Sequence, residues 1–433
     1  MYDKASLALI PSGYKGGSPN GTLYSVLPAN GDGDFTFGRA SSATRVNKDG
    51  LIESVSSGVP RLDYPLIDGV VQSCPALLLE SSRTNNAPYS EDFTEWGITS
   101  TGTTLTSNSA ISPDGNQTAD LLESDGTNAF ARVFDAVSLT SGNNCLYSVF
   151  VKKSGSHDFA SIRVAGTDVG GSGQTGSNYT FTFSTETLSN VGGGTATSTF
   201  VENYGSGWYR IGMEVTNSTI TEVVVYPKFN SSVAGEILMW GAQLEEGSYP
   251  TSYIPTSGST VTRLTEVSNA AGTVSDFNSV QGVLFADLET KKTSGSRVSL
   301  SQAADPFAER VSIDFNTATN IRFFVEASDD NTTFGVPVDT VLKRFKIAVK
   351  WSGVNISVFI DGFEATTDTF TGFTADTLDR LQMTAANGVG SVFEGDIYQL
   401  MTFNEALTDS ELEQITSYRS FGEMAKGQQY TIE

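Results

Sequence analysis

Histidine is the side chain most often used to move protons near neutral pH, and this chain of 433 residues contains one, His157. A single histidine excludes the HExxH zinc motif and every site that needs two histidines. A Ser–His–Asp triad on a hydrolase fold would need a serine held in a GxSxG turn, which the sequence lacks. His157 stands in a polar turn after a strand-like run, so we expect an ordinary loop residue.

Two carboxylates near the end of the chain are the candidates for acid–base chemistry. The run Glu394–Gln399, which includes Asp396, resembles the Glu-x-Asp-x-x-Glu motif of glycosidases with a concanavalin A-like fold. A retaining glycosidase needs two carboxyl groups, one as nucleophile and one as acid. The run ends in Gln399, which cannot act as an acid or a base. We therefore expect no enzyme, and a polysaccharide-degrading enzyme is the alternative.

Calcium would need oxygen ligands that converge from several loops, because no run has the spacing of an EF-hand loop. The side chains available for this are Asp114, Asp120, Glu245, Asp361, Asp376, Asp379 and Asn387. The glycine-rich runs 169–176 and 192–194 predict turns, because no helix follows whose N-terminus could bind a phosphate. We expect no cofactor and no metal, with calcium as the alternative that the acidic turns leave open.

Aromatic rings that stack on pyranose rings are a common basis of sugar recognition. The candidates for carbohydrate binding are Trp96, Trp208, Tyr209 and Trp351. Each ring also has a structural interpretation, because large aromatic side chains dominate the cores of β-proteins. Trp208, for example, lies in a strand-like run with apolar neighbours.

The charge balance limits the partners of the chain. Its 26 basic and 49 acidic residues give a net charge of −23, which repels nucleic acids and anionic membranes. No run of 18 apolar residues predicts a membrane span, and the first residues do not read as a signal peptide. We expect folding in the cytoplasm, no nucleic acid partner and no membrane insertion. Cys74 and Cys145 are expected to be two reduced, buried thiols.

The composition predicts an all-β protein. Glycine is abundant at 43 residues and charged residues make up only 17%, which suits short strands joined by polar turns. Strand-like runs predict two consecutive β-sandwich or jelly-roll domains, at 89–256 and 277–425. Residues 257–276 read as a linker and 426–433 as a tail. Residues 1–88 are irregular and too poor in periodic apolar residues for a core of their own, so we expect them to pack on neighbouring chains or on the next domain.

One short helix is predicted near the C-terminus. Thr408 can cap its first turn while Glu411 reaches back to the Thr408 amide, which is the capping-box pattern. Leu407 and Leu412 are placed to close a hydrophobic staple around this cap.

Three motifs occur in order in the N-terminal region, and they occupy Phe37–Glu53, Pro60–Tyr64 and Cys74–Asn85. Their order, FxRASxATRVNxxGLIE, then PRxDY, then CPxLLLExxRTN, resembles a segment near the N-terminus of many tailed-bacteriophage virion proteins. Gly38 is the one departure from this pattern. The resemblance implies a structural virion protein, a tail or head fibre made in the host cytoplasm.

The two expected domains carry further resemblances. The runs YSVFVKK, Gly207–Ile211 and Met239–Thr256 resemble the carbohydrate-binding-module-like jelly rolls embedded in phage tail proteins. The run Phe393–Ile415 resembles the closing strand and helix of concanavalin A-like lectin sandwiches of the LamG or pentraxin type. These resemblances imply that the sandwiches bind host cell-surface glycans. A prophage-derived bacterial adhesin is a further alternative, which differs only in where the chain is found.

The N-terminal motifs of this acidic chain contain four arginines that are spread along them: Arg39, Arg45, Arg61 and Arg83. Virion appendages are usually cyclic homo-oligomers, often trimers. We therefore expect these arginines at an attachment or oligomer interface, paired with acidic groups of neighbouring copies or of other virion proteins.

Overall fold

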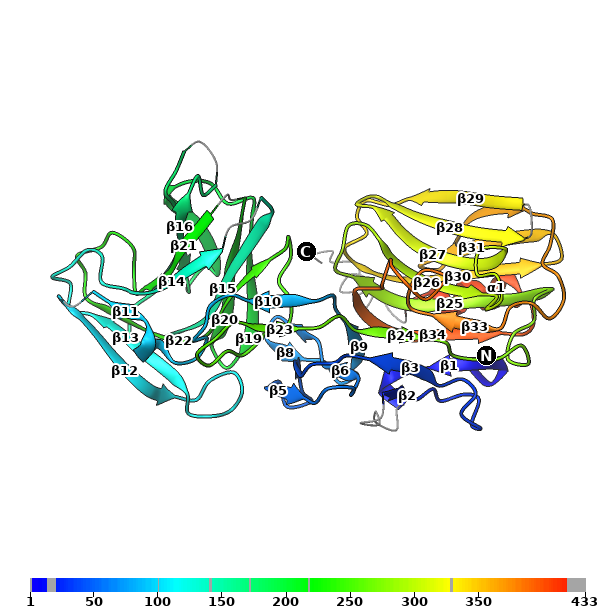
Figure 1. Ribbon diagram of the computed structural model, residues 1–433, viewed down its shortest axis with the longest axis horizontal. Helices are drawn as coiled ribbons and strands as arrows, with labels where there is room; N and C mark the ends of the chain where they lie inside the picture. Colours follow the sequence, from blue (N-terminus) through cyan, green and yellow to red (C-terminus); the bar gives the residue numbers. More distant parts are fainter. Residues whose placement is uncertain are drawn as a thin grey trace.

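The computed structural model describes residues 2–13, 21–99, 101–139, 142–170, 173–216, 219–327 and 330–418. Figure 1 shows a β-sandwich lobe at each end of the long axis, with the blue N-terminal strands lying along and between the two lobes. The predicted all-β fold class is confirmed. The tail expected at 426–433 lies outside the described residues.

The first sandwich packs two antiparallel sheets against each other. Its front sheet contains, in spatial order, β11 (Gly97–Ile98), β14 (Val133–Leu139), β21 (Thr219–Tyr226), β16 (Phe159–Thr167), β17 (Gly176–Thr182) and β18 (Thr187–Gly193). Its back sheet contains β12 (Thr103–Ala110), β13 (Ala119–Ser124), β22 (Gly235–Glu246), β15 (Asn144–Lys153), β20 (Trp208–Thr216) and β19 (Ser198–Gly205). Alternate residues of each strand, such as Ile162 and Val164 of β16, fill the core between the sheets.

The second sandwich is built the same way. Its larger sheet contains β32 (Phe363–Thr369), β31 (Asn355–Ile360), β30 (Arg344–Ser352), β25 (Gln281–Thr290), β34 (Gly395–Phe403), β9 (Ala76–Leu79) and β6 (Arg61–Asp63), with β1 (Ala5–Leu9) also paired to β34. The facing sheet contains β29 (Asp330–Pro337), β28 (Asn320–Ala327), β27 (Glu309–Thr317), β26 (Ser296–Ser301) and β33 (Arg380–Gln382). Apolar side chains from both sheets form one continuous core.

N-terminal strands complete the second sandwich, although most of its residues lie more than 200 positions later in the sequence. β1 and β9 pair with different halves of the same edge of β34, through Leu9 opposite Leu400 and Leu77 opposite Ile397. Leu7, Leu9, Leu77 and Leu79 are fully buried in the core of that sandwich. The described strands of this N-terminal region thus pack inside their own chain.

The first sandwich is also covered by the N-terminal region. The turn after Val46 connects the hairpin of β4 (Ala43–Val46) and β5 (Ile52–Val55). Ile52 of this hairpin packs with Phe150, Trp240 and Tyr253 on the outer face of the back sheet. Smaller pairings complete the region: β2 (Thr22–Leu23), β3 (Phe35–Gly38) and β24 (Val267–Asn269); β10 (Arg83–Asn85) and β23 (Val261–Arg263); β7 (Leu66–Ile67) and β8 (Val70–Val71).

The predicted helix is present as α1 (Asp409–Thr416). The Thr408 hydroxyl accepts from the Glu411 amide, and the Glu411 carboxylate accepts from the Thr408 amide, so the capping box is confirmed. Leu412 buries α1 against the outer face of the larger sheet, where it contacts a cluster that includes Phe285 and Phe359. Short 3-10 turns occur at η1 (Tyr2–Lys4), η2 (Pro11–Gly13) and η3 (Phe93–Glu95). In the described ranges, no helix has the length and apolar character to cross a membrane.

Both cysteines are free thiols. Cys145 is buried in β15, as expected. Cys74 is exposed, so the prediction of two buried thiols is wrong at this position. It precedes β9 at the point where the chain enters the sheet, and only the residues after it reach the core.

The dependence of the second sandwich on β9 can be tested with Leu79→Ala. Leu79 is fully buried, so we expect a loss of about 2–5 kcal/mol in unfolding free energy, with faster hydrogen exchange in β34. Leu51→Ala, at an exposed leucine of the same region, is the matched control and should change stability by about 0.5 kcal/mol or less. Equal effects of the two variants in urea unfolding would contradict this role of β9.

Candidate functional site

The arginines of the N-terminal motifs do not form one interface. The side chains of Arg39 and Arg61 are fully buried and paired with carboxylates of their own chain, so their assignment to an oligomer or attachment surface is wrong. Arg45 pairs with Glu53 across its own hairpin and stays partly exposed. Arg83 lies over the ring of Tyr249, 5.1 Å from its centroid, and is also partly exposed. Apolar alternation could not reveal this, because Arg61 lies in a strand of three residues and Arg39 follows the end of β3.

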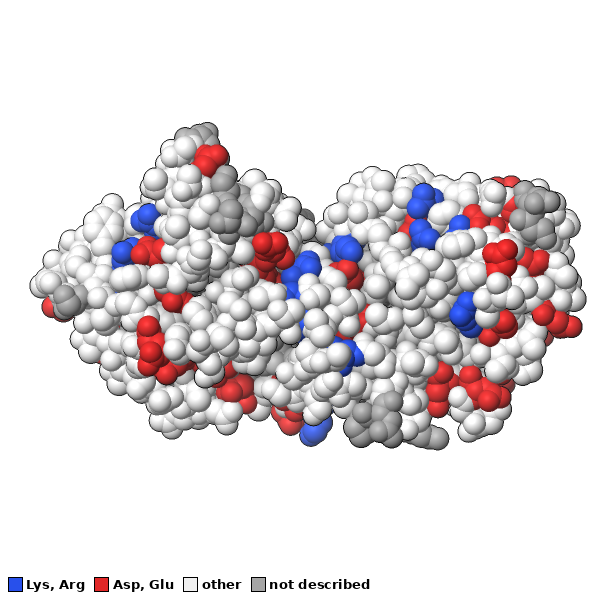
Figure 2. Space-filling view, viewed as in Figure 1, with Lys and Arg blue, Asp and Glu red and all other residues white. Residues whose placement is uncertain are grey.

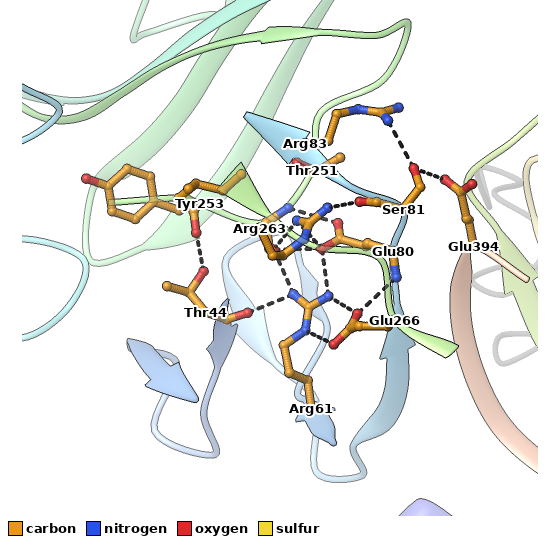
Figure 3. Close-up of polar contacts among 12 residues, drawn as sticks. Thr44, Arg61, Glu80, Ser81, Arg83, Thr251, Tyr253, Arg263, Glu266 and Glu394 are labelled. Carbon is orange, nitrogen blue, oxygen red and sulfur yellow. Dashed lines mark hydrogen bonds and ion pairs between the residues drawn. The ribbon is translucent and has the colours of Figure 1, made fainter. Parts of the chain in front are cut away.

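Arg61 is the centre of a buried cluster between the two sandwiches, shown in Figure 3. Its Nε donates to Glu266 at 2.9 Å and its Nη2 donates to Glu80 at 2.8 Å and to the second oxygen of Glu266. Its Nη1 donates to the carbonyl oxygen of Thr44 and to the hydroxyl of Ser252. Every nitrogen of the Arg61 guanidinium therefore has a hydrogen-bond partner.

Two further arginines complete this cluster. Arg39 donates to Glu266 at 2.6 Å, and Arg263 donates to Glu80 at 2.7 Å. We call Arg39, Arg61, Glu80, Arg263 and Glu266 the arginine–glutamate cluster. The Glu80 carboxylate also accepts from the amide and hydroxyl of Ser252, and Glu266 accepts from the Glu80 amide.

The electrostatics of the cluster follow from its burial and its pairing. Burial by itself raises the pKa of Glu80, but the charges of Arg263 and Arg61 outweigh it and hold that pKa below its ordinary value. Burial lowers the pKa of Arg61, and the carboxylates of Glu266 and Glu80 overcome this and raise it. A lowered carboxylate pKa means that Glu80 stabilises the fold above its unfolded pKa and loses that contribution as the pH falls.

The members of the cluster come from segments far apart in the sequence. Arg61 lies in β6, Glu80 follows β9, and Arg263 and Glu266 lie in the expected linker. Ser252 belongs to the loop that leaves β22 of the first sandwich. The cluster thus joins the N-terminal strands, the first sandwich and the connection to the second sandwich. The residues 257–276, read from composition as a linker, contribute β23 and β24 to this joint.

Asn85, the last residue of the third motif, ties the N-terminal region to the first sandwich. Its Nδ2 donates to the carbonyl oxygens of Ala242 and Ile254, and its Oδ1 accepts from the amides of Leu244 and Ala87. The Asn85 side chain is fully buried, and both its amide nitrogen and its amide oxygen are hydrogen-bonded to main-chain groups. Another residue of similar size could not make the same set of bonds.

A second contact bridges the sandwiches at Glu394. This carboxylate, at the start of β34, accepts from Lys292 at 2.6 Å, from Ser81 at 2.9 Å and from the hydroxyl of Tyr249. Tyr249 comes from the loop after β22, so its bond crosses from the first sandwich to the second. Figure 3 shows the contact between Ser81 and Glu394. Glu394 is buried with these partners, and the three donors occupy its carboxylate inside the protein.

Asp396 lies in a second group of charges beside the cluster. It faces Glu289 across β34 and β25, and Lys291 lies 3.4 Å from it. Burial, then the charge of Asp396, raises the pKa of Glu289 to about 7 and that of Asp63 to about 6. Figure 2 shows basic and acidic side chains together along the seam between the lobes.

A small cavity of about 80 Å³ lies in the same seam, lined by charged side chains that include Asp63, Glu202, Arg210 and Lys291. Binding pockets for small molecules are usually about 300–1,000 Å³. The cavity is therefore of the size that holds a few water molecules.

The tryptophans proposed to stack on sugars are core residues. Trp96, Trp208 and Trp351 are buried, and each indole nitrogen donates to a backbone carbonyl oxygen, that of Tyr89, Ile111 or Asn278 respectively. Their assignment to carbohydrate binding is wrong, because a stacking ring must have one face open. Sequence patterns do not separate a buried indole from an exposed one when its neighbours are apolar in both cases.

Tyr209 is the one of these four rings that is not buried. Its hydroxyl donates to Glu186 at 2.9 Å, and its ring packs against Phe181 and Phe183. Its part in sugar binding stays a prediction.

Two other sequence candidates, His157 and Asp120, have structural partners. The Nε2 of His157 lies 3.0 Å from the carbonyl oxygen of Pro227. Asp120, suggested as a calcium ligand, is buried and accepts from the amides of Phe93 and Asn108. Burial raises its pKa to about 6. In the described part of the chain, no group of three or more histidine, cysteine and acidic residues is arranged to hold a metal ion.

Sequence reasoning missed Glu80, Asn85, Arg263 and Glu266. Glu80 and Asn85 lie inside the third motif but were not singled out. Arg263 and Glu266 are isolated charges in a segment otherwise rich in serine, threonine and glycine. That contrast was the one available indication that the segment is more than a linker.

Comparisons with known proteins give fold likenesses only. No family model matches the sequence, and no curated protein matches it. The carbohydrate-binding module CBM40 of a Ruminococcus gnavus IT-sialidase, bound to α2,3-sialyllactose, is similar with 15% identity and a TM-score of 0.30, over 35% of this chain and 94% of that one. A leech intramolecular trans-sialidase has 18% identity and a TM-score of 0.30, over 35% and 27% of the two chains. A heptameric SAP-like pentraxin from Limulus polyphemus has 15% identity and a TM-score of 0.29, over 35% and 76%. TM-scores this low do not identify a function.

The cluster predicts a large difference between two arginine variants. Arg61→Met leaves Glu80 and Glu266 buried with too little positive charge, so we expect a loss of about 3–5 kcal/mol in unfolding free energy. Arg45→Met, the matched control, breaks a partly exposed pair and should cost about 0–1 kcal/mol. Urea unfolding measures both values, and similar losses would show that the cluster does not hold the joint.

The raised pKa of Glu289 predicts a pH effect of opposite sign to that of Glu80. An acid whose folded pKa lies near 7 adds stability below its unfolded pKa of 4.5 and loses it as the pH rises through 7. The fall in Tm between pH 5 and pH 8 should therefore be smaller for Glu289→Gln than for the natural chain. Glu364→Gln, at an exposed position of β32, is the control. Parallel Tm profiles for the natural chain and Glu289→Gln would contradict the assignment.

Proposed function

We propose that this chain is a non-enzymatic structural protein of a tailed-bacteriophage virion. In this proposal it forms a fibre or related appendage that presents two lectin-like β-sandwiches to glycans on the host surface. The observation that carries the proposal is that the three virion-type motifs build the joint between the sandwiches. Arg61 comes from the second motif, and Glu80 and Asn85 from the third.

This use of the motifs explains why they occur in order. The first motif forms the β4–β5 hairpin over the first sandwich, and the second and third supply β6 and β9 to the second sandwich. A segment that contacts both lobes fixes the direction in which each lobe points. Such fixed spacing suits an appendage that presents binding surfaces away from a particle.

Assembly into a cyclic homo-oligomer, a trimer by analogy with other appendages, is part of the proposal. Arg39 and Arg61 are used inside the chain, so contacts with other copies and other virion proteins must come from other surfaces. The chain would be made in the host cytoplasm and located in the virion.

The hydrolase alternative is not favoured by the geometry. Glu394 is buried and bonded to Lys292, Ser81 and Tyr249, and Asp396 lies beside Lys291. The adhesin alternative uses the same fold and differs only in location.

Two measurements together test the virion assignment. Light scattering of the purified chain should give a mass of at least twice the chain mass of 46.0 kDa. Antibody raised against the chain should label purified virions at regular positions. A stable monomer together with unlabelled virions would overturn the proposal. Label confined to the bacterial surface would favour the adhesin instead.

A further inference from the structure

The outer face of the front sheet of the first sandwich carries a row of side chains across four neighbouring strands. Phe134 of β14 lies opposite Val224 of β21, Val224 opposite Arg163 of β16, and Arg163 opposite Asn178 of β17. Residues on either side of each, such as Ile162 and Val225, point into the core, so this row points away from it. With strands about 4.8 Å apart, the row is about 14 Å long.

Arg163 is a partly buried cation without a counter-ion. It forms no ion pair with any described residue, and its Nε is buried with no hydrogen-bond partner among them. The guanidinium lies against Gly176, where a Cβ atom would approach its Nε to 2.8 Å, so a larger side chain would displace it. In a chain with a net charge of −23, an arginine held without a carboxylate partner is available for an external anion.

Asn178 adds a second unsatisfied group next to Arg163. It is 5% exposed, and its Nδ2 donates to the carbonyl oxygen of Gly192 at 2.9 Å. Its buried Oδ1 has no hydrogen-bond partner in the described structure. A buried acceptor without a partner costs about 1–3 kcal/mol, so a ligand that supplies a donor there gains by it.

The neighbouring polar groups are already paired with one another, and Arg163 and Phe134 are the two members of the row that are partly exposed. Arg132 bonds to Glu222 at 3.1 Å and lies over the ring of Phe134, 4.8 Å from its centroid. One step along the strands, the hydroxyls of Ser161 and Thr180 bond to each other. Among the described residues of this row, the buried polar atoms without a partner are therefore a cationic donor on Arg163 and a neutral acceptor on Asn178, with the partly exposed ring of Phe134 at the far end.

We propose that this row, which we call the Arg163 row, binds a carboxylate-bearing sugar of an acidic glycan. A planar guanidinium pairs with a carboxylate through two parallel hydrogen bonds, and a sugar hydroxyl can donate to the Asn178 Oδ1. Beyond the fully buried Val224, the partly exposed ring of Phe134 offers an apolar edge to a second sugar ring. A phosphodiester would meet Arg163 but has no hydroxyl group of its own to donate to the amide oxygen. This inference rests on the glycan-binding part of the proposed function and names the class of glycan.

The test is titration calorimetry of the full chain with three probes: a glucuronate-containing oligosaccharide, sialyllactose and neutral lactose. Binding of either acidic probe, with no binding of lactose, is expected. The two acidic probes distinguish a uronic acid from a sialic acid as the source of the carboxylate.

Variants locate the site. Arg163→Met should weaken binding of the acidic probe at least tenfold, and Arg163→Lys should weaken it less, because the charge stays while the two-pronged geometry is lost. Lys228→Met, which removes a charge from the same sandwich outside the row, is the matched control and should change the Kd less than twofold. The Tm of each variant shows whether it is folded, and Arg163→Lys keeps the test valid if Arg163→Met is not.

The outcomes separate the two proposals. Natural affinity for an acidic probe in both folded Arg163 variants would overturn the Arg163 row and leave glycan binding by the protein intact. Stronger binding of lactose than of both acidic probes would overturn the acidic class. No binding of any probe would overturn the row for these glycans, while labelling of virions would still decide the structural role.

Discussion

The position of each sandwich depends on the charge of Arg61 between Glu80 and Glu266. Taking an arginine and two glutamates out of water costs several kcal/mol per ion, and only complete pairing offsets this cost. The cluster nearly meets that condition, because Arg39 and Arg263 add positive charge, the Thr44 carbonyl oxygen accepts from Arg61, and the Ser252 amide and hydroxyl donate to Glu80. The buried Nε of Arg263 is the one donor of the three guanidinium Nε groups without a partner among the described residues. Such a cluster has one arrangement that satisfies all its members, so it defines a relative orientation as well as a contact.

Because of this cluster, the N-terminal region is an integral part of both sandwiches and not a separate attachment segment. Its strands β1, β6 and β9 belong to the second sandwich, its β4–β5 hairpin covers the first, and Asn85 is bonded into the edge of β22. The bond between Tyr249 and Glu394 adds a direct contact between the sandwiches. A ligand bound at the Arg163 row would therefore be held at a fixed distance and direction from the second sandwich.

Part of this could be predicted from the sequence because it depends on local patterns. The predicted capping box at Thr408 is such a pattern, and it is present. The polar turn residues after Val46 are another, and they connect the β4–β5 hairpin. The partners of Arg61 could not be predicted, because Glu266 is 205 positions away and no periodicity connects the two.

The candidate site was predicted less well for a related reason. Trp96, Trp208 and Trp351 have the residue type for sugar stacking, but burial is decided by which elements cover them, and those elements are distant in sequence. The sequence does not single out Arg163, because nothing in the residues around it shows that it has no acidic partner. Its significance appears only when the strands on both sides of β16 are known.

The central claim is that the arginine–glutamate cluster holds the sandwiches in one relative orientation. Distance measurement between spin labels tests it most directly, with labels at Val233→Cys in the first sandwich and Val354→Cys in the second, both exposed, in a Cys74→Ser background. The structure predicts a single narrow distance distribution that broadens when Arg61→Met is added. A broad or multiple distribution in the chain with Arg61 intact would contradict the account.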